Sequence, residues 1–110
     1  MTIEKRAART EYKERKPQPG IYAVKCEAAG QIWVGATPTL NSIQNRIWFG
    51  LRMGNSPHRV MQQAWAEHGE AQFSWIELEK LEGEETGYIL DAKLSDRARF
   101  WRAHFNAQPI

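Results

Sequence analysis

Hydrophobic and polar positions alternate most clearly between residues 20 and 35, where two short segments predict a pair of strands. The triplet Gly-Ile-Tyr at 20–22 begins the first strand, about 20–26, and Trp-Val-Gly at 33–35 ends the second, about 31–35. Residues 28–30 supply the turn, where Gly30 can adopt a positive φ. Because side chains of a strand alternate between faces, Tyr22 and Trp33 are expected on the same face.

Two helical patterns follow the hairpin. From about Leu40 to Met53, apolar residues recur at helical spacing, and Arg46 lies on the flank of that stripe. The segment Gly-Asn-Ser-Pro at 54–57 predicts a stop and a new start, with Ser56 as the cap and Pro57 as the first residue of a helix to 67 or 68. The residues expected to be buried on this second helix are Val60, Met61, Ala64 and Trp65.

The remaining chain predicts one strand and one long helix. The strand, about 72–81, carries apolar residues on both faces and is expected to be partly covered on both. An acidic loop at 82–87 leads to a helix from about Tyr88 to Phe105, with Ser95 as its candidate for an interruption. The expected buried side of this helix is Leu90, Leu94, Ala98, Trp101 and Phe105. A helix capped by Thr2 and a proline-containing linker are expected before the hairpin.

The order helix–β–β–α–α–β–α predicts one α+β domain, a small three-stranded antiparallel sheet flanked by helices. A chain of 110 residues is long enough for one core. Residues 1–16 hold six basic and three acidic side chains, and residues 77–86 hold five acidic side chains and one lysine. The basic end is a candidate face for phosphate, although two solvated charge clusters explain the pattern equally well.

The single cysteine, Cys26, excludes an intramolecular disulfide and is expected to be buried in the first strand. This use of cysteine suits a reducing cytoplasm. The N-terminus has no apolar segment typical of a signal peptide. No stretch approaches the roughly 18 apolar residues that span a bilayer. We therefore expect a cytoplasmic protein with no membrane partner.

Several of these features together resemble the GIY-YIG endonuclease superfamily. They are the two triplets, Arg46 on the following helix, the helix end at 65–69, the strand at 73–79 and the Phe-Trp pair at 100–101. The resemblance covers about residues 20–105. It implies a GIY-YIG-like nuclease domain at 20–110, preceded by a basic arm or helix with its linker at 1–19. It also implies cleavage of DNA phosphodiester bonds with Mg²⁺ or Mn²⁺.

The resemblance assigns roles to four residues. Tyr22 matches the first tyrosine, which lies beside the scissile phosphate, and Arg46 matches the arginine that binds this phosphate. A fixed guanidinium stabilises phosphate charge without reorganisation. Trp33 stands where the second tyrosine is expected, and its indole can wall a pocket but cannot relay a proton through a hydroxyl. His58 lies near the position of a helper histidine, although a surface histidine is the simpler interpretation.

The metal ligand is where the chain departs from the family. The family glutamate is expected about three residues before an aromatic residue like Trp101, and Ala98 occupies that position. The nearest carboxylate, Asp96, lies about 200° away around the helix, so it replaces the glutamate only if the helix is shifted or bent. Mg²⁺ is usually held by one or two carboxylates together with phosphate, so this loss is serious.

Two functions remain open from the sequence. The first is a metal-dependent DNA endonuclease acting on single-stranded, nicked or branched DNA. The second is a catalytically impaired, nuclease-derived module that binds nucleic acid, and Ala98 and Trp33 favour it. The expected phosphate contacts are Arg46, Arg52, Arg59 and Lys25. A protein-interaction domain with a tryptophan-rich surface is a third possibility without a motif of its own.

Overall fold

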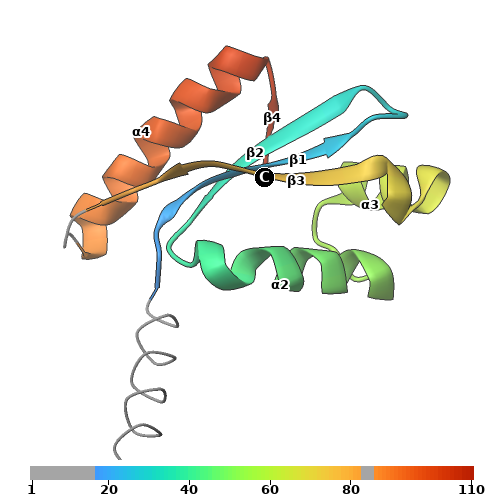
Figure 1. Ribbon diagram of the computed structural model, residues 1–110, viewed down its shortest axis with the longest axis horizontal. Coiled ribbons are helices and arrows are strands. Elements are labelled where there is room, and N and C mark those ends of the chain that lie inside the picture. Colours follow the sequence, from blue (N-terminus) through green and yellow to red (C-terminus); the bar gives the residue numbers. More distant parts are fainter. Residues whose placement is uncertain (1–16, 83–85) are drawn as a thin grey trace, which may run out of the picture.

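The computed structural model describes residues 17–82 and 86–110, which form a mixed sheet with helices on both faces (Figure 1). The elements are β1 (Gly20–Cys26), β2 (Gln31–Thr37), α2 (Leu40–Met53), α3 (Arg59–His68), the 3-10 turn η1 (Glu70–Gln72), β3 (Phe73–Lys80), α4 (Gly87–Phe105) and β4 (Gln108–Pro109). The sheet order is β3-β1-β2-β4. Helix α4 covers one face, and α2 and α3 cover the other. The expected N-terminal helix lies outside the described residues.

The hairpin of β1 and β2 confirms the alternation predicted from the sequence. Tyr22 lies opposite Gly35 and Val24 lies opposite Trp33 in an antiparallel register. Gly30, at φ 64°, makes the turn. Tyr22 and Trp33 therefore project to the same face, toward α2 and α3.

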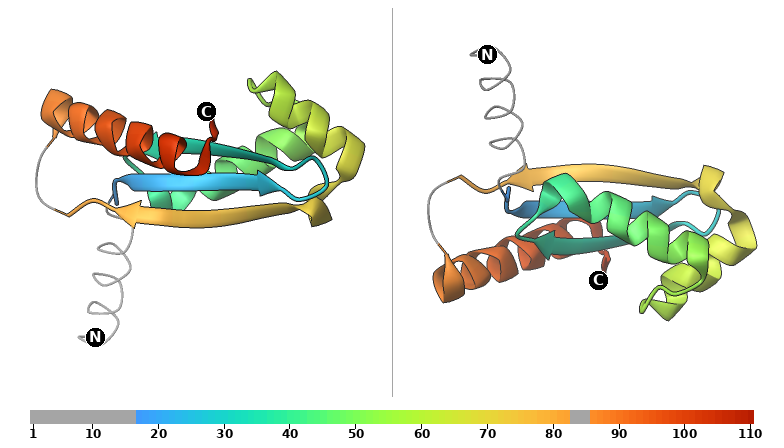
Figure 2. Two further views of the ribbon diagram at one scale, coloured as in Figure 1. Left: turned by 90° about the horizontal axis from the view of Figure 1, so that it is seen from above. Right: turned by 90° about the horizontal axis from the view of Figure 1, so that it is seen from below.

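A β-bulge in the pairing of β1 with β3 decides where two glutamates point. Tyr22 pairs with Glu77, but its neighbour Ile21 pairs with Glu79, so β3 carries one extra residue here. Glu79 turns to the α4 side, where its Oε1 accepts hydrogen bonds from Arg97 and Trp101. Glu77 stays in register with Tyr22, and β1, β2 and β3 lie side by side in Figure 2.

The sheet separates two hydrophobic cores. The α2-side core contains Tyr22, Val24, Cys26, Trp33, Leu40, Trp48, Leu51, Met61, Ala64, Trp65 and Phe73. The α4-side core contains Ile21, Ala23, Val34, Leu94 and Ala98. Strand β1 contributes to both, so it is buried on both faces, as the burial of Cys26 also shows.

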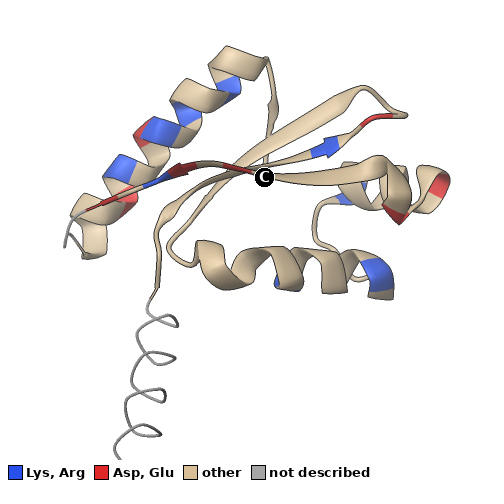
Figure 3. Cartoon of the chain, viewed as in Figure 1, with Lys and Arg blue, Asp and Glu red and all other residues tan. Residues whose placement is uncertain are grey.

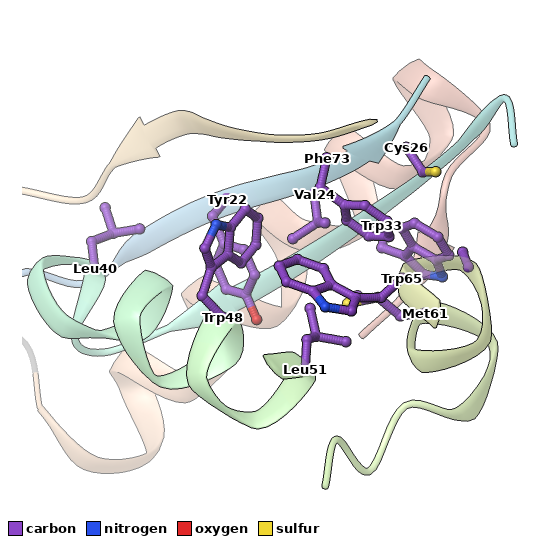
Figure 4. Packing of buried hydrophobic residues seen from close by; sticks show 11 residues of the cluster. Tyr22, Val24, Cys26, Trp33, Leu40, Trp48, Leu51, Met61, Trp65 and Phe73 are labelled. Carbon is purple, nitrogen blue, oxygen red and sulfur yellow. The ribbon is translucent and has the colours of Figure 1, made fainter. Parts of the chain in front are cut away.

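Aromatic rings fill the centre of the α2-side core (Figure 4). Trp48 meets the rings of Trp65, Phe73 and Trp75 edge-on, with centroid distances of 5.5, 6.4 and 5.6 Å. Tyr22 stacks on Trp75 at 4.7 Å. Such ring pairs stabilise the packing beyond the area they bury. The tyrosine is therefore held in a rigid aromatic layer.

The expectation of a three-stranded antiparallel sheet is wrong in one respect, because β4 adds a fourth strand parallel to β2. Trp33 pairs with Gln108 and Val34 with Pro109. Asn106, in the left-handed conformation at φ 54°, ends α4 and turns the chain back along β2. A strand of two residues is too short to show an alternation of hydrophobic and polar positions in the sequence. Its proline is tolerated because the strand lies at the edge of the sheet.

The helices differ from the predictions mainly at their ends and exposed sides. Helix α3 begins at Arg59 with His58 as N-cap, because the Ser56 hydroxyl accepts the His58 N–H and closes a separate turn. Val60 is 50% exposed and Phe105 is 37% exposed, so neither is a core residue. Helix α4 continues through residue 95 without interruption. Within residues 17–82 and 86–110, no helix has the length and apolar character needed to cross a bilayer.

The glycine that starts β1 predicts a strong substitution effect. A Cβ on Gly20 would collide with the backbone oxygen of Glu79 and with the Leu40 side chain. Gly20→Ala is expected to destabilise the fold by about 2 kcal/mol, through forced displacement of β3. Thermal unfolding measures this, and the melting temperature should fall by roughly 8 °C or more. Gly50→Ala is the control, since its Cβ would meet only Ser56 at 3.8 Å and alanine favours a helix; equal losses would contradict the explanation.

Candidate functional site

Tyr22 is almost fully buried, and its hydroxyl lies over a glycine. The side chain is 3% exposed. A Cβ on Gly35 would lie 2.6 Å from the Tyr22 hydroxyl oxygen, which is closer than real contacts allow. Glycine at this position of β2 therefore makes room for the phenol to lie across the strand. The two triplets are linked by this packing and not only by backbone pairing.

The positive charge of Arg46 acts on the Tyr22 hydroxyl through space. Burial raises the pKa of Tyr22 to about 12, and the Arg46 charge partly opposes that rise. The phenol is therefore protonated at neutral pH and can donate a hydrogen bond. Arg46 is exposed on α2, and its Nη2 donates to the Ser42 hydroxyl at 3.4 Å. No carboxylate among the described residues pairs with Arg46, so its guanidinium is available to an anion.

Trp33 lies on the same face of the sheet as Tyr22, two residues before Gly35 on β2. It is 2% exposed and stacks on Phe73 at a centroid distance of 6.2 Å. Figure 4 shows it beside Trp65 and Met61 in the α2-side core. Trp33 also lines a cavity of about 250 Å³ with His58 and Arg59, at the start of α3. The structure thus brings Trp33 together with these two predicted site residues.

The other predicted phosphate contacts lie apart from this face or are already paired. Arg52 makes a bidentate pair with Glu70, at 3.0 and 2.6 Å, and the hydrogen bond from Arg52 lowers the pKa of the Glu70 carboxyl. Lys25 alternates to the α4 side of β1 and pairs with Glu27 at 3.0 Å. Lys and Arg positions are spread over both sides of the fold in Figure 3, most densely along α4. Charge alone does not mark the site.

Asp96, the predicted metal ligand, lies on α4 and is separated from Tyr22 by the sheet. It is exposed and pairs with Arg99 at 3.0 Å. Ala98 is 1% exposed and packs in the α4-side core. The structure therefore does not bring Asp96 to Tyr22 and Arg46. In the described part of the chain, no three acidic, histidine or cysteine side chains form a metal cluster.

Glu77 is the carboxylate that the sequence reasoning missed. It pairs with Tyr22 across β1 and β3, and alternation from Phe73 and Trp75 puts it on the α2 side of the sheet. Its side chain is 44% exposed, and its pair with Lys80 is loose at 3.8 Å. Mg²⁺ is often held by one carboxylate, waters and substrate phosphates, so Glu77 fits that chemistry. The alternation of β3 could have placed Glu77 on this face, but only the pairing of β1 with β3 places it beside Tyr22.

Comparison with solved structures identifies the fold. The catalytic domain of the intron endonuclease I-TevI, in a mutant form, superposes with a TM-score of 0.66 at 24% identity, covering 81% of this chain and 84% of that chain. The chain has a GIY-YIG fold. A second structure, of the catalytic domain of the homing endonuclease I-TevI, gives a TM-score of 0.65 at 24% identity, covering 84% and 97%. No protein-family model and no curated protein matches the sequence. The GIY-YIG fold predicted from the two triplets is thus confirmed.

Burial of Tyr22 predicts an unusual titration. Of the three tyrosines, Tyr22 should ionise at a pKa of about 12, and Tyr22→Phe should remove that late step from a spectrophotometric titration. Because the folded pKa is raised, the linked stability is present below pH 10 and is lost as pH rises toward 12. This loss is on the order of 2–3 kcal/mol. Ionisation of all three tyrosines near pH 10 in the folded protein would contradict the burial.

The environment of Ala98 predicts that restoring the family glutamate fails. Ala98→Glu would place a carboxylate among Ile21, Ala23 and Leu94, at a cost of about 3 kcal/mol or more. Denaturant unfolding measures this loss. Ser95→Glu, on the exposed side of α4, is the matched control and should change stability by no more than about 0.5 kcal/mol. If Ala98→Glu is tolerated as well as the control, the assignment of position 98 to the core is wrong.

Proposed function

We propose that this protein is a DNA endonuclease that hydrolyses phosphodiester bonds with a divalent cation. The observation that carries the proposal is the Tyr22 hydroxyl, held over Gly35 within the field of Arg46, which pairs with no carboxylate of the described residues. A guanidinium with no acidic partner is suited to bind a phosphate, and a protonated phenol adds a hydrogen bond to it. The GIY-YIG fold supports the proposal, since both similar structures are endonuclease catalytic domains.

Each residue of the candidate site would have a role that follows from the chemistry of its side chain. Arg46 would bind the phosphate and offset the negative charge that builds on it. Tyr22, neutral at physiological pH, would donate to a phosphate oxygen or orient the attacking water. When bound, a divalent cation stabilises charge on the leaving and non-bridging oxygens, and Glu77 is the residue that would hold it. Trp33 would form a packed wall of the site and take no part in proton transfer, because its indole can donate a hydrogen bond but cannot accept a proton.

A nucleic-acid-binding module without catalysis is the second candidate. Two observations favour it: Ala98 leaves no carboxylate on α4 toward this site, and Trp33 has no hydroxyl. In this alternative, Arg46 and Arg59 would hold phosphates electrostatically, and affinity would fall steeply with salt. DNA is the proposed partner in both cases, in single-stranded, nicked or branched form. The single buried cysteine supports action in a reducing compartment such as the cytoplasm.

The decisive experiment incubates the full chain with labelled single-stranded, duplex, nicked and branched DNA in Mg²⁺, Mn²⁺ or EDTA. We expect cleavage that requires the cation, and Arg46→Ala should reduce it at least about 100-fold, the effect of removing one fixed donor to the reacting phosphate. Arg99→Ala, an exposed arginine on the far side of the sheet, is the control and should leave the rate unchanged. Salt-sensitive binding without cleavage in any metal would reject the endonuclease and support the binding module.

A binding experiment tests Glu77 with a readout that does not depend on turnover. Glu77→Gln keeps the shape of the side chain and removes the charge that would hold the cation. Isothermal titration of the DNA-bound protein with Mn²⁺ should show at least roughly tenfold weaker binding for this variant. Asp96→Asn should bind Mn²⁺ like the unmodified chain. The opposite pattern would transfer the metal role back to Asp96.

A further inference from the structure

The cavity beside Trp33 lies where β2, β4 and the start of α3 meet. Its polar lining comes from Trp33, His58, Arg59 and Gln108, and no carboxylate contributes to it. The Trp33 and Arg59 side chains can only donate, His58 and Gln108 each carry a donor beside an acceptor, and Arg59 adds a permanent positive charge. A volume of about 250 Å³ is ample for a phosphate group. The lining is therefore suited to an anion and unsuited to a cation.

The indole N–H of Trp33 is a donor for which the described residues 17–82 and 86–110 provide no side-chain or backbone acceptor. No side-chain hydrogen bond of Trp33 is found within the described residues, although the residue is 2% exposed. No fully buried side-chain nitrogen or oxygen in this part of the chain lacks a partner. The indole nitrogen must therefore reach the small accessible surface that Trp33 retains, and we infer that this surface faces the cavity, since Trp33 is one of its lining residues. An almost buried donor directed into a cavity needs an acceptor there.

The first turn of α3 adds backbone donors on the same wall. His58 is the N-cap, but its side chain makes no capping hydrogen bond. The first N–H groups of a helix have no partner inside the helix, and no acceptor for those of Arg59, Val60 and Met61 is found among the described residues. These three residues line the cavity. Helix N-termini favour anions through these N–H groups and the helix dipole.

We propose that this cavity is a phosphate subsite, filled by a phosphate of the nucleic-acid strand next to the one bound at Tyr22 and Arg46. Arg59, the first-turn N–H groups of α3 and the Trp33 indole would donate to its oxygens. Trp33 and Gly35 are two residues apart on one face of β2, so their Cα atoms are separated by roughly 6–7 Å along the strand and the two sites are neighbours on this face. That the phosphate belongs to a nucleic-acid strand rests on the proposed function, whereas the existence of an anion site in this cavity does not.

The test is a titration of the full ¹⁵N-labelled chain, in EDTA, followed through the indole N–H signals of its five tryptophans. The ligands are inorganic phosphate and a short single-stranded oligonucleotide with or without a 5′-phosphate. Trp33→Phe assigns the Trp33 signal. Phosphate should shift that signal and the amides of Arg59, Val60 and Met61. Arg59→Ala should raise the dissociation constant at least about tenfold, as expected for loss of a charged donor.

Matched variants separate this site from the first one. Arg46→Ala should leave the phosphate-induced shift of Trp33 in place, and so should Arg99→Ala, which removes the same charge on the far side of the sheet. Shifts with both oligonucleotides indicate a backbone phosphate, and a shift with the 5′-phosphorylated strand alone indicates a terminal one. No Trp33 shift with any ligand, or an equal loss in Arg99→Ala, overturns the subsite. Because no cleavage is measured, failure of the endonuclease proposal leaves this result interpretable.

Discussion

Strand β1 is buried on both faces, and this constraint decides the arrangement of the site. Its alternate residues must serve two different cores, with Ile21 and Ala23 toward α4 and Tyr22 and Val24 toward α2. A shift of one residue in register would exchange every one of these positions. The close packing of Gly20 and Gly35 against their neighbours opposes such a shift. Tyr22 is consequently fixed on the α2 side, and the whole sheet separates it from the side chains of α4.

The candidate site contains several hydrogen-bond donors and few carboxylate groups. Tyr22 is kept protonated by burial, and neither an acidic partner of Arg46 nor an acceptor for the Trp33 N–H is found among the described residues. Such a surface matches the oxygens of phosphate without any catalytic step. Hydrolysis demands more, namely a held cation or a base, and Glu77 is the carboxylate in register with Tyr22. In the proposed function, recognition and catalysis would therefore fall to different residues, so such a site could retain the first without the second.

The sequence predicted what depends on periodicity. The bounds of α2, Leu40–Met53, follow from its apolar spacing, and the shared face of Tyr22 and Trp33 follows from strand alternation. Features that depend on single contacts were missed. Strand β4 exists because Asn106 redirects the chain, and α3 starts late because Ser56 caps a turn instead. The position of Glu77 beside Tyr22 required the pairing of β1 with β3, which no local pattern contains.

The β-bulge in β3 has a further consequence, for behaviour at high concentration. Strand β3 is the outer strand on its side of the sheet, whereas β4 partly covers β2 on the other side. Outer strands invite pairing with other molecules, and bulges and charges oppose it. Here the bulge lies next to the exposed charges of Glu77 and Lys80. The glutamate that is suited to hold a cation also protects the sheet against intermolecular strand addition, so its neutralisation affects colloidal stability as well as chemistry.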